Sequence, residues 1–371
     1  MKLIRPLNRS MAALATLALV AAACGGGAES ADSSTTSTST TTTTVKATTT
    51  TSSTSSTSTT STTLPPTIRQ PLTGAPLATE EERLLRPALF AKIDNNPLAV
   101  PNHSGLAVAD IVFEEVVEAR TTRFAAIFHS QSSDPLGPIR SGRSQDVDLG
   151  TSFNSPLFVG SGGNGGVTRL INESQLINMG PGNASGYYRG PGRAPHNLYT
   201  STDNIWLQTP EGHPGPPPQQ FQYLDEGEAV AGEPVAGVRV RVGGENIEWT
   251  WNPDEARFDR SQRGRPHDDK TFGRIRSTNV IVMSVDYRPS VIDRNSPEAQ
   301  TIGEGPVWIF TDGQVRQGTW KREFSLFPIE FFSPEGVPIE LAPGNTWIEL
   351  ADNTDVDAGG VEVLPPAPPA P

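Results

Sequence analysis

The amino-acid sequence predicts an α+β protein, with a mixed α/β part over residues 67–236 followed by an antiparallel β-meander over residues 237–357. In the first part, the buried-strand pattern "SPLFVGSGGNGG" leads through a glycine turn into "VTRLINESQLINM", whose apolar residues recur at helical spacing. In the second part, "GVRVRV", "NIEWTW" and "NVIVMSVDY" have strand patterns, and turn signals such as Asp312-Gly313 separate further strands. Roughly 290 residues are thus expected to fold, enough for two modest domains or one large one.

The other elements of the first part are a strand and a β-hairpin. "RPALFAKIDN" predicts the strand, and "IVFEEVVEARTTRFAAIFHS" predicts the hairpin. Glu114 and Glu118 are expected on one face of the hairpin, with Glu115 on the other. The backbones of Glu114 and Glu118 would then lie roughly 13 Å apart, which is too far for the two catalytic carboxylates of a glycosidase. All six tryptophans lie at or after Trp206, where strand alternation favours core packing over a sugar-stacking platform.

The ends of the chain predict export and a tether. Residues 1–23 combine three basic side chains with an apolar stretch too short to span a bilayer, which predicts a signal peptide. Cys24 follows it, where a lipoprotein signal ends, although Ala21 to Ala23 would also suit ordinary cleavage. Residues 24–66 are rich in Ser and Thr and predict a disordered tether, and residues 358–371 predict a proline-rich disordered tail. With one cysteine, the mature chain can form no internal disulfide.

The charge of the chain limits the classes of partner. The formal net charge is −12, and removing the three basic residues of the signal makes it −15. Such an acidic chain without basic tracts is not expected to bind nucleic acid. Any anion that it binds must be met by a local cationic cluster.

The stretch "DPLGPIRSGRSQDVD" is the best candidate for such a cluster. Arg140 and Arg143 lie three residues apart in a glycine-rich and serine-rich loop, and the planar guanidinium binds carboxylate or phosphate through two parallel hydrogen bonds. The alternative is internal pairing with one of the nearby carboxylates, which are Asp94, Glu114, Glu115 and Glu118.

A glycine turn provides a second candidate. Gly160, Gly162 and Gly165 form a G-x-G-x-x-G pattern between a strand and a helix. A dinucleotide is not expected, because no acidic residue follows at the required distance and no second parallel strand is predicted after the helix. No Gly-Lys-Ser/Thr is present for a P-loop, so neither nucleotide nor other cofactor is predicted. What remains is an ordinary turn or an anion site formed by the backbone of Gly162, Gly163, Asn164 and Gly165.

Histidines and amides supply the remaining candidates. His129 and His196 are possible general bases, with Glu114 as the carboxylate partner, although structural roles are the alternative for each. No histidine pair has the spacing of a zinc helix, so no metal site is expected. A further polar cluster, which ordinary turns could equally explain, consists of Asp94, Asn95, Asn197 and Tyr199.

Several motifs taken together resemble one bacterial family. In order they are "KIDNNPLAVPNHSGLAVADIVFEE", "TRFAAIFHS", "GPIRSGR", "APHNLYTST", "RGRPHDD" and "GEGPVWIFTDGQVRQGTWKRE" followed by "PGNTWIEL". The sequence resembles the YerB-like exported lipoproteins, which carry domain of unknown function 3048 in N-terminal and C-terminal halves. The resemblance extends from about residue 71 to residue 350. It implies a surface lipoprotein in two parts, and it brings no assigned catalytic residues.

These observations lead to one hypothesis and two alternatives. We expect a non-catalytic lipoprotein at the membrane, facing the cell wall, with an anion-recognising cleft formed by the Arg140–Arg143 loop and the glycine turn. Its partner would be a wall polymer or a wall-associated protein. One alternative is a wall hydrolase or transferase using His129 or His196, and the other is a scaffold that regulates wall-synthesis enzymes.

Overall fold

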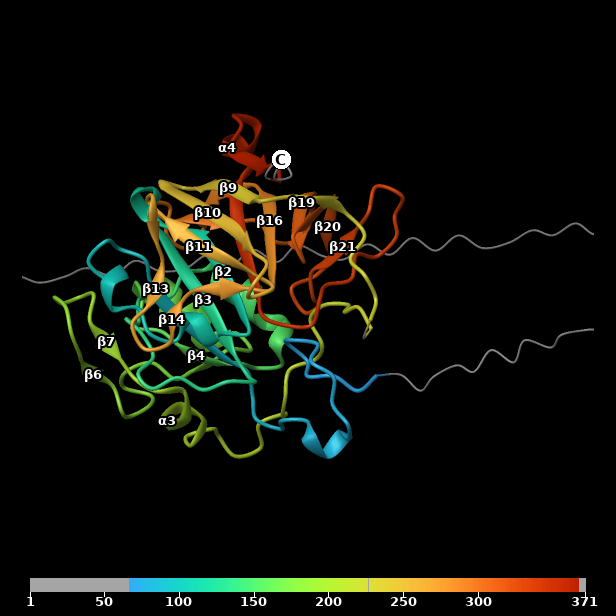
Figure 1. Ribbon diagram of the computed structural model, residues 1–371. Coiled ribbons are helices and arrows are strands. Elements are labelled where there is room, and N and C mark those ends of the chain that lie inside the picture. Colours follow the sequence, from blue (N-terminus) through green and yellow to red (C-terminus); the bar gives the residue numbers. More distant parts are fainter. Residues whose placement is uncertain (1–66, 226, 367–371) are drawn as a thin grey trace, which may run out of the picture. The chain divides into compact units, whose positions relative to one another are not determined.

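One 11-stranded sheet runs through the molecule and takes strands from both predicted parts (Figure 1). The computed structural model describes residues 67–225 and 227–366, so Cys24, the predicted signal and the predicted tether lie outside the described residues. The strand order is β21 (Glu330–Phe332), β20 (Gln314–Arg322), β19 (Gly303–Thr311), β16 (Asn279–Val285), β22 (Thr346–Asp352), β2 (Ile111–Val116), β3 (Thr122–Phe128), β1 (Leu89–Asp94), β4 (Leu157–Val159) and β5 (Ile177–Asn178), with β8 (Glu233–Pro234) beside β20. The sequence boundary near residue 236 therefore does not separate two sheets.

The first part contains the predicted hairpin and one parallel unit. β2 and β3 pair antiparallel, as expected, but β2 ends at Val116 and Glu118 lies in a 3-10 turn, η4 (Glu118–Arg120). The prediction that Glu114 and Glu118 share a strand face is therefore wrong. The expectation of no second parallel strand is also wrong, because β4, α2 (Gly165–Glu173) and β5 form a short parallel β-α-β unit. Two residues of β5 were too few to give a strand signal.

The second part is built mainly from antiparallel hairpins. β16, β19, β20 and β21 pair antiparallel in succession, and Asp312 and Gly313 both have positive φ in the turn between β19 and β20. β22 is an exception, because it lies parallel to both β16 and β2. The mixed and antiparallel sheets with few helices confirm the α+β prediction.

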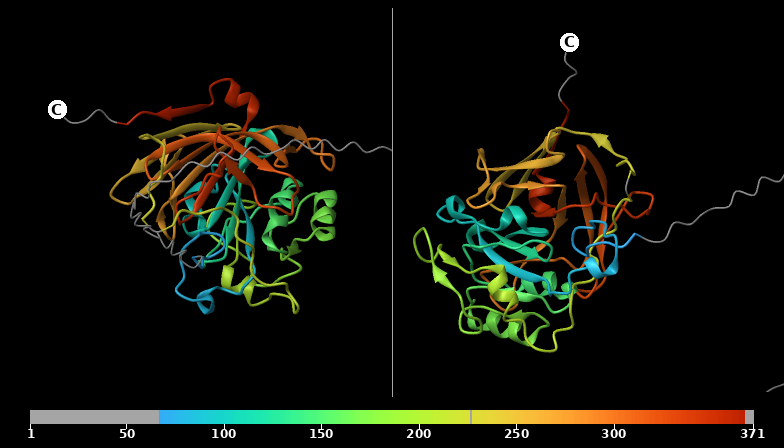
Figure 2. Two further views of the ribbon diagram at one scale, coloured as in Figure 1. Left: turned by 90° about the vertical axis from the view of Figure 1, so that its right-hand side faces the viewer. Right: turned by 60° about the horizontal axis from the view of Figure 1, so that its bottom comes forward.

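A second, six-stranded sheet covers one face of the large sheet (Figures 1 and 2). Its order is β12 (Arg265–Pro266), β11 (Arg257–Gln262), β10 (Glu245–Asn252), β9 (Gly237–Val242) and β23 (Val361–Leu364), with β15 (Arg276–Ser277) beside β11. β23 pairs antiparallel with β9. Residues 361–364 therefore belong to the fold, and the prediction of a disordered tail from residue 358 is wrong at these positions.

Short elements complete the described chain. The remaining strands are short and form three separate antiparallel pairs. These are β6 (Tyr188–Arg189) with β7 (Leu198–Tyr199), β13 (Asp268–Asp269) with β14 (Gly273–Arg274), and β17 (Tyr287–Pro289) with β18 (Pro297–Ala299). The helices besides α2 are α1 (Gln145–Gly150), α3 (Thr202–Trp206) and α4 (Asn353–Asp357). The 3-10 turns besides η4 are η1 (Glu80–Glu82), η2 (Val100–Asn102), η3 (Leu106–Val108) and η5 (Thr151–Phe153).

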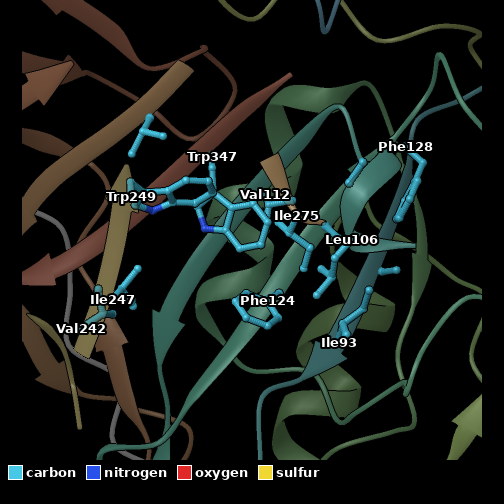
Figure 3. Close-up of a cluster of buried hydrophobic side chains, with 14 of the residues drawn as sticks. Ile93, Leu106, Val112, Phe124, Phe128, Val242, Ile247, Trp249, Ile275 and Trp347 are labelled. Carbon is cyan, nitrogen blue, oxygen red and sulfur yellow. The ribbon is translucent and has the colours of Figure 1, made fainter. Parts of the chain in front are cut away.

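Two hydrophobic clusters lie on opposite faces of the large sheet. The first includes the space between the sheets, where Phe124, Trp249 and Trp347 pack edge to face (Figure 3). The second includes Phe90 and Phe158 and is covered in part by α1 and α2. Because side chains alternate along a strand, neighbouring residues of β1, β2 and β3 point into different clusters. This alternation separates two networks of ionisable residues.

Candidate functional site

The arginine loop and the glycine turn meet at one edge of the large sheet. β1 and β4 are parallel neighbours, so their carboxyl ends lie side by side, with Asp94 ending one and Gly160 following the other. The Ser161 N–H donates to the Arg140 carbonyl (2.9 Å), and the Gly142 N–H donates to the Gly162 carbonyl (2.8 Å). Open α/β sheets commonly place ligand sites at the carboxyl ends of their strands.

Three guanidinium groups gather here, which we call the arginine cluster: Arg123, Arg140 and Arg143. Arg140 Nε lies 3.2 Å from Asp94 Oδ2, and Arg143 donates to Glu118 Oε2 (2.5 Å). Both arginines of the loop thus have internal partners, which is the alternative that the sequence left open. Arg123 donates to the Ser141 carbonyl (2.8 Å) and has no ion-pair partner within 4.0 Å among the described residues.

Arg123 is the residue of this cluster that sequence reasoning missed. It begins the second strand of the hairpin, is only 7% exposed, and lies opposite Asp94 in the β1–β3 register. Burial, followed by the positive charges of Arg143 and Arg140, lowers its pKa to about 10. The sequence feature that could have indicated Arg123 is its position immediately before the apolar run "FAAIF", because an unpaired charge is rare in a buried strand.

His196 joins the cluster from the loop-rich segment. Its Nδ1 lies 2.6 Å from Asp94 Oδ2, and its side chain is 13% exposed. Its Nε2 makes no hydrogen bond to the described residues. Asn197 shapes this loop by donating to the carbonyls of Gly190 and Gly192, and the Tyr199 hydroxyl donates to the Asn102 carbonyl (3.0 Å). A carboxylate on Nδ1 holds the imidazole in a fixed orientation.

The glycine turn is exposed, but its helix start is already capped. Asn164 Oδ1 accepts from the Val167 N–H (2.8 Å), and Asn164 Nδ2 donates to Asp293 (2.7 Å). Gly162, Gly163 and Gly165 are exposed, and Gly162 has a φ of +99°, which favours glycine. The turn therefore supports the arginine loop through backbone hydrogen bonds. The Val167 N–H at the start of α2 is occupied by the Asn164 cap, so it is not available to an anion.

Beneath the arginine cluster lies a fully buried set of charges, which we call the lysine triad: Lys92, Glu115 and Asp146. Lys92 Nζ donates to Glu115 Oε1 and to Asp146 Oδ1, the latter at 2.6 Å, and all three residues have 0% exposure. Asp146 Oδ2 also accepts from the Arg143 N–H (2.7 Å), so the triad is joined to the arginine loop.

The other candidates lie elsewhere. His129 is at the opposite end of β3 from Arg123, fully buried, with its Nε2 3.1 Å from the Arg86 carbonyl. Burial lowers the pKa of His129 to about 4, with a further contribution from Arg86. Glu114 and Asn95 point to the other face of the sheet, where Asn95 Nδ2 donates to Glu114 Oε1 (3.1 Å). The structure therefore brings His196 together with Asp94 but not with His129 or Glu114.

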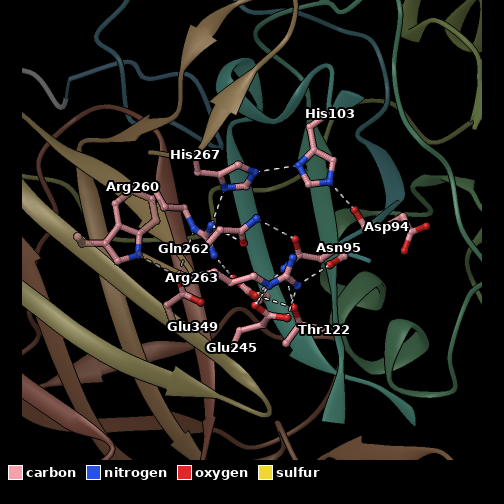
Figure 4. A network of polar contacts seen from close by, with 12 residues as sticks. Asp94, Asn95, His103, Thr122, Glu245, Arg260, Gln262, Arg263, His267 and Glu349 are labelled. Atoms are coloured by element: carbon pink, nitrogen blue, oxygen red, sulfur yellow. Dashed lines mark hydrogen bonds and ion pairs between the residues drawn. The ribbon is translucent and has the colours of Figure 1, made fainter. Parts of the chain in front are cut away.

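Glu114 belongs to a buried network between the two sheets, which we call the sealed network. Figure 4 shows Arg260, His267, His103 and Glu349 of this network. Arg260 donates to Glu114 and lies 2.5 Å from His267 Nδ1 and 3.8 Å from Glu349, and all of these side chains are fully buried. His103 continues the network, with Nδ1 2.8 Å from His267 Nε2 and Nε2 2.6 Å from the Asp94 carbonyl. It thus connects the sealed network to the backbone at the arginine cluster.

Burial sets the protonation states of the sealed network. It lowers the pKa of His103 to about 4 and that of His267 well below its usual range, where Arg260 adds to the effect. It raises the pKa of Glu349 well above its usual range, and the charge of Glu114 adds to that shift. With both histidines neutral and burial disfavouring a charge on Glu349, Arg260–Glu114 is the main ion pair of this network, an arrangement that suits structure rather than ligand binding.

An apolar groove of about 310 Å³ lies away from these charges, beside β21. Phe327, Ile329 and Phe331 line it together with glutamines and glutamates, and its lining has no histidine, lysine or arginine. This groove therefore offers no cationic side chain for an anion. Among residues 67–225 and 227–366, no group of three or more metal-binding side chains is found, and no helix is long and apolar enough to cross a membrane.

Comparison with known proteins places this architecture in a family. Models of the N-terminal and C-terminal domains of "Protein of unknown function (DUF3048)" match residues 72–214 and 238–348. The chain belongs to the DUF3048 family. Its arginine cluster and lysine triad fall within the N-terminal match, and Arg260 and His267 fall within the C-terminal match.

Comparisons of sequence and of structure both find the chain similar to YerB of Bacillus subtilis. The chain is 28% identical over 307 residues to "Putative lipoprotein YerB" of Bacillus subtilis (strain 168), covering 79% of this chain and 88% of that protein. It also matches the crystal structure of the YerB protein from Bacillus subtilis with a TM-score of 0.67 and 26% identity, covering 80% of this chain and 99% of the other. The predicted resemblance to YerB-like proteins is confirmed.

Proposed function

We propose that this chain is an exported lipoprotein that binds an anionic group at the arginine cluster without chemically changing it. The observation that carries the proposal is the charge arrangement. Arg123 has no carboxylate partner within 4.0 Å among the described residues, and the terminal nitrogens of Arg140 donate no hydrogen bond to them. A guanidinium with free donors at the edge of a sheet suits a carboxylate or phosphate oxygen.

The depth of the cluster favours a ligand group carried on a larger molecule. Arg123 is nearly buried and Arg140 has 20% of its side chain exposed, so an anion would contact Arg140 first and Arg123 behind it. The carboxylates Asp94 and Glu118 would repel a broad anionic surface, but a single presented group could fit between them.

The N-terminal segment and the similarity to YerB support a lipid anchor and a partner in the cell wall. A protein named as a lipoprotein is similar over 79% of this chain, and Cys24 lies where a lipid would be attached. Residues 24–66 would then carry the folded region away from the membrane toward the wall. We therefore propose a carboxylate or phosphate of a wall polymer as the ligand, or an acidic group of a wall-associated protein.

The test is sedimentation of the soluble region, residues 67–366, with purified cell walls. This region includes β23, which pairs with β9. We expect binding that weakens as salt is added and that falls about tenfold or more in Arg140→Ala, as for a lost charge-assisted hydrogen bond. Arg239→Ala, which removes an exposed arginine from β9, is the matched control and should bind like the parent. Equal binding by all three proteins would refute the site, and no binding by the parent protein would refute a wall polymer as the ligand.

A second candidate function rests on the 2.6 Å contact between His196 and Asp94. A histidine oriented by a carboxylate, with its other nitrogen unbonded, is the geometry of a general base. In that case the chain would be a wall hydrolase or transferase, and the arginines would orient the substrate. Release of soluble fragments from the same walls, abolished in His196→Asn, would favour this function over binding alone.

A further inference from the structure

The lysine triad brings an amine and two carboxyl groups together inside the protein. Lys92 is on β1, Glu115 is on β2, and Asp146 is in the first turn of α1. Lys92 Nζ contacts Glu115 Oε1 and lies 2.6 Å from Asp146 Oδ1. This contact places the amine next to the carboxyl carbon that bears the oxygen, and a fixed near-attack arrangement of this kind favours reaction between the two groups.

The surroundings of the triad disfavour a fully charged state. All three residues have 0% exposure, and Phe90 and Phe113 lie two residues before Lys92 and Glu115 on the same strand faces. One ammonium with two carboxylates would leave an uncompensated negative charge in the core. Burial raises the pKa of Glu115 to about 7, so this carboxyl can both hold and release a proton near neutral pH. An amide bond between the amine and one carboxyl group would remove two charges from the core.

We propose that Lys92 and Asp146 condense to form an intramolecular amide bond, with Glu115 as the catalytic proton carrier. The lone pair of the neutral Nζ attacks Cγ of the protonated Asp146 and forms the Nζ–Cγ bond. Glu115 gives its proton to the departing hydroxyl and takes one from Nζ. The Cγ–OH bond breaks, one water molecule leaves, and Glu115 ends in its starting state. No oxidant, cofactor or other reactant is consumed.

A hydrogen bond from the backbone favours Asp146, and not Glu115, as the carboxyl group that Lys92 attacks. Asp146 Oδ2 accepts the Arg143 N–H (2.7 Å), and such a fixed donor stabilises the negative charge that develops on a carboxyl oxygen under attack. Glu115 Oε2 has no hydrogen-bond partner within residues 67–225 and 227–366, which leaves it free to exchange protons. The two carboxyls thus have different environments that suit different roles.

The bond would lock the sheet to the segment that follows the arginine loop. Lys92 and Asp146 enclose β2, β3 and the whole of that loop. The chain has a single cysteine and so lacks an internal disulfide for this purpose. This inference stands independently of the proposed anion site, because it concerns groups that no ligand reaches.

Peptide mass spectrometry of the full chain, denatured and digested with trypsin, tests the proposal. Trypsin cuts after a free lysine but not after an acylated one. We expect peptide 84–120, uncut at Lys92, joined to peptide 144–169, with a combined mass lower than the sum by one water molecule. Cleavage after Lys92, with peptide 144–169 at its unmodified mass, would overturn the proposal and leave an ion-paired triad. A branch at Glu115 would overturn the assignment of Asp146.

Three variants identify the roles of the groups, and the result for the parent chain does not depend on how well they fold. Lys92→Arg lacks the primary amine and should give no joined peptide. Asp146→Asn should still give the joined peptide, through loss of ammonia in place of water. Glu115→Gln should leave most of the chain unjoined, because an amide cannot carry the proton, and full joining in this variant would refute its catalytic role.

Discussion

The two charged networks on opposite faces of β1, β2 and β3 are made of the same residue types but differ in their access to solvent. Asp94 and Glu115 contribute to the face with the arginine cluster, and their neighbours Asn95 and Glu114 contribute to the sealed network. The sealed network leaves Arg260 fully buried, whereas Arg140 is partly exposed. The difference shows that burial, not residue type, separates a structural ion pair from a candidate ligand site.

The largest effect expected from this comparison is loss of stability in Arg260→Ala. The change would leave the buried Glu114 without its cation, and we expect the free energy of unfolding to fall by about 3–5 kcal/mol. Urea denaturation of residues 67–366 measures this. A loss below about 1 kcal/mol would show that the sealed network does not hold the two sheets together.

The two faces should also respond to pH in opposite directions. His103, whose pKa falls to about 4, is neutral in the folded state while the unfolded chain takes up a proton below pH 6.5, so its contribution is lost as the pH falls through this window. Glu115, whose pKa rises to about 7, keeps its proton in the folded state, so its contribution is present below pH 4.5 and lost as the pH rises to 7. Each amounts to about 3 kcal/mol.

Urea denaturation from pH 4 to pH 8 would resolve the two contributions. His103→Gln should reduce the acid-side loss of stability, which His129 and His267 share, and Glu115→Gln should reduce the loss toward neutral pH, which Glu349 shares. The same pH slope in the parent and in both variants would contradict the burial argument for both faces.

The smallest expected effect on stability is that of Arg140→Ala. Its partner Asp94 keeps the His196 contact, and Arg140 is partly solvated, so the free energy of unfolding should change by less than about 1 kcal/mol. Thermal unfolding of the variant used for wall sedimentation measures this. A loss comparable to that of Arg260→Ala would place Arg140 among the structural residues and remove it from the candidate site.

Sequence reasoning reached the features that are encoded by neighbouring residues. The β2–β3 hairpin, the strand into the glycine turn and the loop with Arg140 and Arg143 each have a local pattern. The arginine loop and the glycine turn were expected to form one cleft, but their place at the ends of the parallel neighbours β1 and β4 was not predicted.

Local sequence patterns did not predict contacts between residues that lie far apart in the chain. Glu114 and Arg260 lie 146 positions apart, and no local pattern pairs them. β23 is short and follows a proline-free but glycine-rich segment, so its pairing with β9 gave no signal. The lysine triad was missed for a related reason, because Lys92 and Asp146 are brought together only when α1 packs on the sheet.

The position of β22 has a consequence for how the chain is made. This strand, Thr346–Asp352, lies in the middle of the large sheet between β16 and β2, although it follows every other strand of that sheet along the chain. Until it arrives, β2 and β16 each present an unpaired edge that could join another chain. The emerging polypeptide therefore needs to be kept apart from its neighbours until residue 352 is available, and a chain cut short before residue 346 would expose both edges permanently.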